Sequence, residues 1–187
     1  MTTPQAFLSL ATAFGLSTAA GLNAYIPLLI VAVLSRLTSL ITLNPPYDAL
    51  SSWWVIGILA VLLVVEILVD KIPAADTAND VVHTFIRPAA GAILFAASTN
   101  VIGLHPVLGA ICGVVLAGGV HVAKAGGRPV VSATTAGMGN PIVSTIEDVI
   151  SFVTSLLAIV APYVVLALVI IALSLFIWRH ERRRRSR

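Results

Sequence analysis

Long apolar runs dominate this chain of 187 residues and restrict the folds open to it. Hydrophobic residues make up 58% of the sequence and charged residues 10%, whereas a soluble domain carries about 25% charged residues. Because a helix needs about 20 apolar residues to cross a bilayer, each of the runs 53–70, 86–102 and 104–123 predicts a membrane span. We therefore expect an integral membrane protein, with residues 1–178 forming a single transmembrane domain.

Two further apolar regions are too long for single spans, and both contain helix-breaking residues. As one helix at about 1.5 Å per residue, residues 5–43 would extend about 60 Å, and Gly21 and Asn23 interrupt them. Residues 149–178 are interrupted by Pro162. Backbone groups at such breaks must be satisfied within the protein. The sequence therefore predicts an all-α polytopic bundle of about six membrane segments, with discontinuous or re-entrant helices.

The break near the start of the chain resembles a second stretch near its end, residues 134–141. Glycine and asparagine breaks in both halves of a membrane protein are typical of broken helices that meet at a central site. Under that interpretation, the backbone of the site comes from Gly21, Asn23, Gly137, Gly139 and Asn140. The alternative is that both stretches are kinks or the beginnings of loops.

The end of the chain is strongly basic. Six of the eleven Lys and Arg residues lie within 179–187, and the positive-inside tendency predicts that this tail faces the cytoplasm. The first five residues lack the basic region of a signal peptide, so we expect no cleaved segment. The positive charge of the tail is attracted to anionic lipid headgroups, and we expect no nucleic-acid partner. We expect the protein to lie in a bacterial cytoplasmic membrane and to form a homo-oligomer.

With six crossings and a cytoplasmic tail, the charges divide between the two membrane sides. The cytoplasmic connections are then expected to hold Lys71, Arg87, Lys124 and Arg128. The opposite side is expected to hold Arg36, a turn near Asn100, and the acidic pair Glu147 and Asp148.

Cys112 stands alone in an apolar run, so no disulfide or thiolate metal site is expected.

Residues 66–88 concentrate charge in this otherwise apolar chain. Asp76, Asp80, His83 and Arg87 are spaced by four, three and four residues, which places them on one face of a helix. An interfacial helix face whose charges neutralise one another explains this pattern. A carboxylate within the apolar run costs several kcal/mol unless it is paired or protonated, which favours proton coupling or cation binding. The candidate residues are Glu66, Asp70, Asp76, Asp80, His83 and Arg87.

A second cluster consists of His121, Lys124 and Arg128, again on one helix face. Basic groups at a helix C-terminus stabilise its dipole, and Gly126 and Gly127 predict that the helix ends there. The alternative is a cationic pocket for a phosphate or carboxylate, or a partner for the acidic stripe Asp70, Asp76 and Asp80. Farther along, Thr145 is expected to cap a helix that carries Glu147 and Asp148 in its first turn.

In combination, several blocks resemble a known bacterial membrane family, catalogued as domain of unknown function 4126. The blocks are 21–25, 69–73, 80–88 and 137–141 followed by Glu147 and Asp148, and the resemblance extends from about residue 8 to 175. It implies the fold and the membrane location. It implies no activity, because the family has no assigned one.

The charges and the breaks together predict a transporter or channel for a small solute or ion, with proton coupling through the acidic residues. We expect no cofactor. One alternative is an enzyme that acts on a lipid phosphate with Mg²⁺ held by Asp70, Asp76 and Asp80, since Mg²⁺ prefers oxygen ligands. Another is a non-catalytic membrane scaffold whose charged blocks bind a partner.

Overall fold

In the computed structural model, residues 3–70, 73–100, 102–136 and 138–162 are described, together with 164, 170, 171, 174, 175, 177 and 178; for Thr3 and residues 73–80 the backbone alone is described. Across the described residues the secondary structure is entirely helical. The helices are α1 (Thr3–Leu22), α2 (Tyr25–Leu37), the short 3-10 helix η1 (Tyr47–Ser51), α3 (Trp53–Val69), α4 (Pro73–Asn100), α5 (Pro106–Thr135) and α6 (Asn140–Val160).

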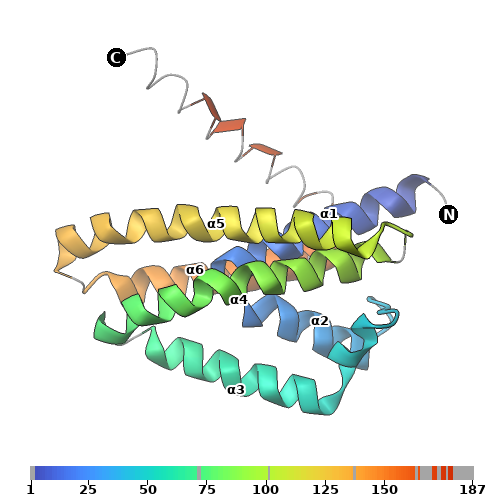
Figure 1. Ribbon diagram of the computed structural model, residues 1–187, viewed down its shortest axis with the longest axis horizontal. Helices are drawn as coiled ribbons and strands as arrows, with labels where there is room; N and C mark the ends of the chain where they lie inside the picture. Colours follow the sequence, from blue (N-terminus) through green and yellow to red (C-terminus); the bar gives the residue numbers. More distant parts are fainter. Residues whose placement is uncertain are drawn as a thin grey trace.

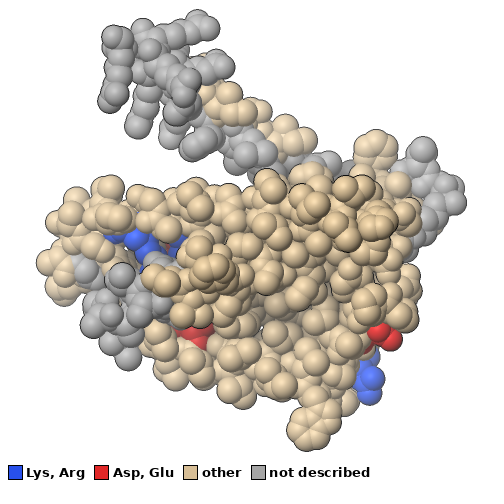
Figure 2. Space-filling view, viewed as in Figure 1, with Lys and Arg blue, Asp and Glu red and all other residues tan. Residues whose placement is uncertain are grey.

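The helices form a bundle of the kind predicted from the apolar runs. Four of them, α1, α4, α5 and α6, contain segments long and apolar enough to cross a membrane, while α2 and α3 are shorter apolar helices. Helix α1 packs against α4, α5 and α6, and α4 packs along α5. Figure 1 shows α2 and α3 on one side of these helices. On the face in Figure 2, the described charged side chains lie toward the two ends. The middle band shows no charged side chain, as a lipid-facing surface requires.

The first predicted break is confirmed and lies inside the bundle. Helix α1 ends at Leu22, and α2 begins at Tyr25 and runs back alongside α1 (Figure 1). With 13 residues, or about 20 Å, α2 is too short to cross the bilayer. The second overlong run is also interrupted as expected, because α6 ends at Val160, two residues before Pro162.

Glycine residues allow α4 and α5 to pack unusually closely. A β-carbon added to Gly113 would collide with the backbone of Gly91 and Ala92, and one added to Gly91 would collide with Gly113 and Ala117. Interfaces between membrane helices gain stability from such close backbone approach. The contact is therefore a structural requirement of the bundle.

Alanine at Gly113 is expected to destabilise the bundle by about 1–3 kcal/mol, because the added methyl group forces α4 and α5 apart. Gly119 lies on the same helix with open space around its α-carbon. Alanine at Gly119 is expected to be neutral or to stabilise by up to about 1 kcal/mol. Thermal unfolding of both variants in the same detergent tests this difference, and equal effects would contradict it.

Two predicted helix boundaries are wrong. Helix α5 does not end at Gly126 and Gly127 but continues through Pro129 to Thr135. Within a bilayer an unpaired backbone group costs several kcal/mol, more than the roughly 1 kcal/mol that a helical glycine costs. Helix α6 begins at Asn140, next to the proline that favours a helix start. Thr145 therefore lies inside α6, where its hydroxyl donates to a backbone carbonyl of the same helix.

Candidate functional site

A network of charged and polar side chains lies in the interior of the bundle, next to the break between α1 and α2. Glu66 of α3 accepts a hydrogen bond from Arg87 of α4, with 3.2 Å between Oε1 and Nη2. His83, one turn earlier on α4, places Nε2 3.4 Å from the same oxygen. On its other side, Arg87 places Nη1 3.0 Å from Nδ1 of His121 on α5. Three helices therefore meet at one guanidinium group.

The network is almost completely shielded from the surroundings of the protein. The exposed fractions are 2% for Glu66, 2% for His83, 1% for Arg87 and 3% for His121. Three of its polar atoms, Glu66 Oε2, His83 Nδ1 and Arg87 Nε, have no hydrogen-bond partner among the described residues. Burying such atoms costs free energy that a purely structural ion pair would avoid. Unpaired buried polar atoms of this kind are expected where function requires them.

Two neutral side chains orient the histidines of the network. Thr84 Oγ1 lies 3.1 Å from Nε2 of His121, so both ring nitrogens of His121 have polar neighbours. The ring of Tyr25, at the start of α2, packs edge-on against the ring of His83 with 5.8 Å between centroids. The short helix that follows the break therefore contacts the charged network directly.

A second group of charges links the break to α5 and α6. Lys124 of α5 places Nζ 2.7 Å from Oε2 of Glu147 on α6, and it also donates a hydrogen bond of 3.1 Å to the carbonyl of Leu22. A lysine at this position stabilises the negative end of the α1 dipole. Arg128 lies 3.6 Å from the same Glu147 oxygen. The end of α1 is thus held by a cation that is itself paired with a carboxylate.

Asn23, within the break, is buried and uses its whole side chain. Its Oδ1 accepts from the backbone N–H groups of Tyr25 and Ile26 at 3.0 Å each, which caps the start of α2. Its Nδ2 donates to Oδ1 of Asp148 at 2.9 Å. Nearby, Ser144 of α6 donates to the carboxylate of Asp70 at the end of α3. Helix α6 therefore contacts both the α1–α2 break and α3.

Most of the predicted site residues come together, although they come from α3, α4, α5 and the break between α1 and α2. Those with described side chains near the break are Asn23, Glu66, Asp70, His83, Arg87, His121, Lys124 and Arg128. Gly21 lies at the close contact of α1 with α5, where a β-carbon would collide with Val120. The side chains of Asp76 and Asp80, and all of Gly137, lie outside the described residues.

The second predicted break is a turn at the end of the bundle. Gly139 and Asn140 join α5 to α6, and Asn140 exchanges hydrogen bonds with Ser132. Met138, beside them, is 80% exposed. These residues lie where α5 ends and α6 begins, and both helices are long enough to cross the membrane. The turn therefore differs from the buried break at Asn23.

The predicted sidedness of the acidic pair is wrong. Glu147 and Asp148 were expected on the side opposite Lys124, but Glu147 pairs with Lys124 and Asp148 bonds to Asn23. The cause is the early start of α6, which places both acids about two turns inside the helix. Figure 2 shows basic side chains in a recess at this end, close to the start of α4.

Sequence reasoning did not assign Glu147, Asp148, Ser144, Tyr25 or Thr84 to the site. A signal for the first three was present. Ser144, Glu147 and Asp148 follow Asn140 by four, seven and eight residues, which places them on one face of a helix that begins at Asn140. Tyr25 and Thr84 carried no comparable signal, because their roles depend on which helices pack together.

The fold and this interior network define a class: a polytopic helical membrane protein that carries paired charges across several helices in its core. The chain belongs to the family described as Domain of unknown function (DUF4126), which it matches over residues 10–182. No curated protein matches the chain. No solved structure matches it either.

Proposed function

We propose that this protein is a transporter or channel for a small solute or ion, and that proton movement through Glu66 drives or gates it. The observation that carries the proposal is the shared oxygen of Glu66, which faces both Arg87 and His83 in a fully buried site. Ionisable groups buried in membrane segments are costly and mark ion or proton pathways.

Protonation of Glu66 is proposed as the switching event. A neutral Glu66 holds Arg87 less strongly, so α3 separates more easily from α4. The broken helix supports the same proposal, because α2 begins beside the network, where the ring of Tyr25 packs against that of His83.

The enzyme alternative requires a metal site. Among the described residues, no group of three or more His, Cys, Asp or Glu side chains is close enough to hold a metal ion. The Mg²⁺ site considered for this chain also needs Asp76 and Asp80, whose side chains lie outside the described residues. Chelator-sensitive turnover of a lipid phosphate would support that alternative.

The direct test is transport by the purified protein in liposomes. A pH gradient is imposed across the membrane, and an entrapped pH-sensitive dye reports proton entry while a panel of solutes is added outside. We expect at least one solute to accelerate proton entry above the rate of protein-free liposomes. If no solute or ion does so in a broad panel, the transport proposal is overturned.

We further propose that the protein resides in a bacterial cytoplasmic membrane as a homo-oligomer, with the basic tail 179–187 in the cytoplasm. Six arginines in this tail oppose its translocation. A reporter enzyme that is active only in the cytoplasm is expected to be active when fused after Arg187. Activity only of an exported reporter would reverse the proposed orientation.

A further inference from the structure

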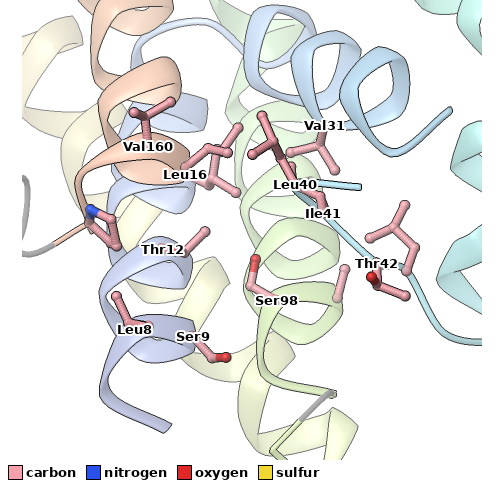
Figure 3. Close-up of a pocket in the computed structure, with 14 residues that line it drawn as sticks. Leu8, Ser9, Thr12, Leu16, Val31, Leu40, Ile41, Thr42, Ser98 and Val160 are labelled. Atoms are coloured by element: carbon pink, nitrogen blue, oxygen red, sulfur yellow. The ribbon is translucent and has the colours of Figure 1, made fainter. Parts of the chain in front are cut away.

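A separate cavity of about 370 Å³ lies between α1, α2, α4, α6 and the segment 40–43. Figure 3 shows side chains from these elements around one space, with Thr12 of α1 and Ser98 of α4 both beside it. The rim includes the exposed residues Leu40 and Val160, whereas Leu16 and Val31 are 1% and 2% exposed and form the floor. The cavity is therefore a pocket that deepens into the bundle.

The pocket lies at the other end of α1 from the charged network. Its floor residue Leu16 precedes Asn23 by seven residues, or about 10 Å along a helix. The intervening layer consists of small and aliphatic buried residues. It includes Ala20, Ala24, Ala90, Leu94 and Ala117. The pocket and the network are therefore neighbouring but distinct sites.

The lining of the pocket is aliphatic with a few hydroxyl groups. None of the described residues that line it is charged, so an ion or a charged solute would find no partner of opposite charge there. The hydroxyls belong to Ser9, Thr12, Thr42 and Ser98. A cavity of this size and mixed lining is typical of small-molecule sites.

Two of the hydroxyls can only accept hydrogen bonds from a molecule in the pocket. Thr12 donates its proton to the carbonyl of Ala158 at 2.9 Å, and Ser98 donates to the carbonyl of Leu94 at 2.8 Å. A hydroxyl has one donor hydrogen and two acceptor lone pairs. Both oxygens therefore offer lone pairs, one from α1 and one from α4, and a complementary molecule must supply the donor.

We infer that this pocket binds an uncharged, largely apolar molecule that carries a hydrogen-bond donor, such as an alcohol or an amide. The apolar body lies against Leu16 and Val31, and the donor reaches Thr12 or Ser98. Binding does not rest on the proposed function. Only the further step, that the bound molecule is the transported solute, rests on it.

The test uses three probes with the same ring system: 1-naphthol, naphthalene and 1-naphthoate. Each is titrated against the full-length protein in lipid nanodiscs, and its fluorescence is corrected with empty nanodiscs. We expect saturable binding of 1-naphthol that the double variant Thr12→Val/Ser98→Ala weakens about 5-fold, the effect of one lost hydrogen bond, and the single variants show which of the two oxygens accepts it. Naphthalene binding is expected to be insensitive to both substitutions, and 1-naphthoate is expected to bind at least 10-fold more weakly than 1-naphthol.

Thr18→Val is the matched control. Thr18 lies on α1, donates to the carbonyl of Phe14 four residues earlier, as Ser98 donates to that of Leu94, and does not line the pocket. This variant is expected to bind 1-naphthol like the unaltered protein. If Thr12→Val does not fold, Thr12→Ala replaces it in both the single and the double variant, because it removes the same oxygen with a smaller side chain.

Competition distinguishes the two sources of such a ligand. Displacement of 1-naphthol by dioctanoylglycerol, an uncharged lipid with one hydroxyl, supports a membrane-derived ligand, whereas displacement only by 1-hexanol supports a free solute. The inference is overturned by an absence of saturable 1-naphthol binding, by equally tight binding of 1-naphthoate, or by equal losses in Thr18→Val and the pocket variants. Saturable binding of 1-naphthol without solute-driven proton entry would contradict the proposed transport function. It would still support the inference that the pocket binds an uncharged molecule.

Discussion

Arg87→Leu is expected to destabilise the protein by about 3–5 kcal/mol, the cost of removing one partner from a buried ion pair. Arg87 is 1% exposed and contacts both Glu66 and His121. Its loss leaves the carboxylate of Glu66 without its strongest partner in an apolar interior. Equilibrium unfolding in mixed detergent measures the change in free energy.

A double variant separates this effect from a general packing defect. In Glu66→Leu combined with Arg87→Leu no charge is left unpaired, so most of the lost stability is expected to return. Arg36→Leu is the control, because Arg36 is exposed and its guanidinium lies 5.7 Å from the ring centroid of Trp53. That control is expected to cost at most about 1 kcal/mol. A double variant as unstable as Arg87→Leu would show that Arg87 acts through packing alone.

Glu66→Gln is expected to reduce solute-driven proton entry in liposomes to the level of protein-free liposomes. Glutamine has nearly the same volume as glutamate but cannot take up or release a proton. It keeps an oxygen that can accept from Arg87, so the bundle is expected to stay folded. His83→Ala removes the other titratable group that faces Glu66 Oε1 and is expected to uncouple proton entry from solute flux.

Asp48→Asn provides the control for this experiment. Asp48 is an exposed carboxylate in η1, remote from the network, so its neutralisation is expected to leave the proton entry rate unchanged. The pH dependence supplies an independent check. In the unaltered protein, the rate of solute movement is expected to depend on pH through Glu66. In Glu66→Gln, any residual solute movement is expected to be independent of pH. Full proton coupling in Glu66→Gln would exclude Glu66 as the coupling group.

Fold class and the position of the buried break could be predicted because both follow from short-range rules. A lipid-embedded chain must form helices of a length set by the bilayer, so the apolar runs indicated where helices lie. Gly21 and Asn23 marked the end of α1 because a run of 39 residues exceeds one crossing. The helix boundary at Gly126 was wrong, because local propensity is weaker than the need to pair backbone groups in a bilayer. The boundary at Thr145 was wrong because the proline next to Asn140 favours an earlier helix start.

The sequence by itself determined that this protein is a helical membrane bundle and that Glu66 lies within an apolar run, but it placed Arg87 and Lys124 in connections between helices, whereas they lie within α4 and α5. Only the tertiary structure decided how these charges pair. The partner of Arg87 is Glu66, 21 residues away, and the partner of Lys124 is Glu147, on the next helix. Spacing along a helix shows which side chains share a face. The depth and rotation of neighbouring helices decide which faces meet, and these depend on close contacts such as Gly91 with Gly113.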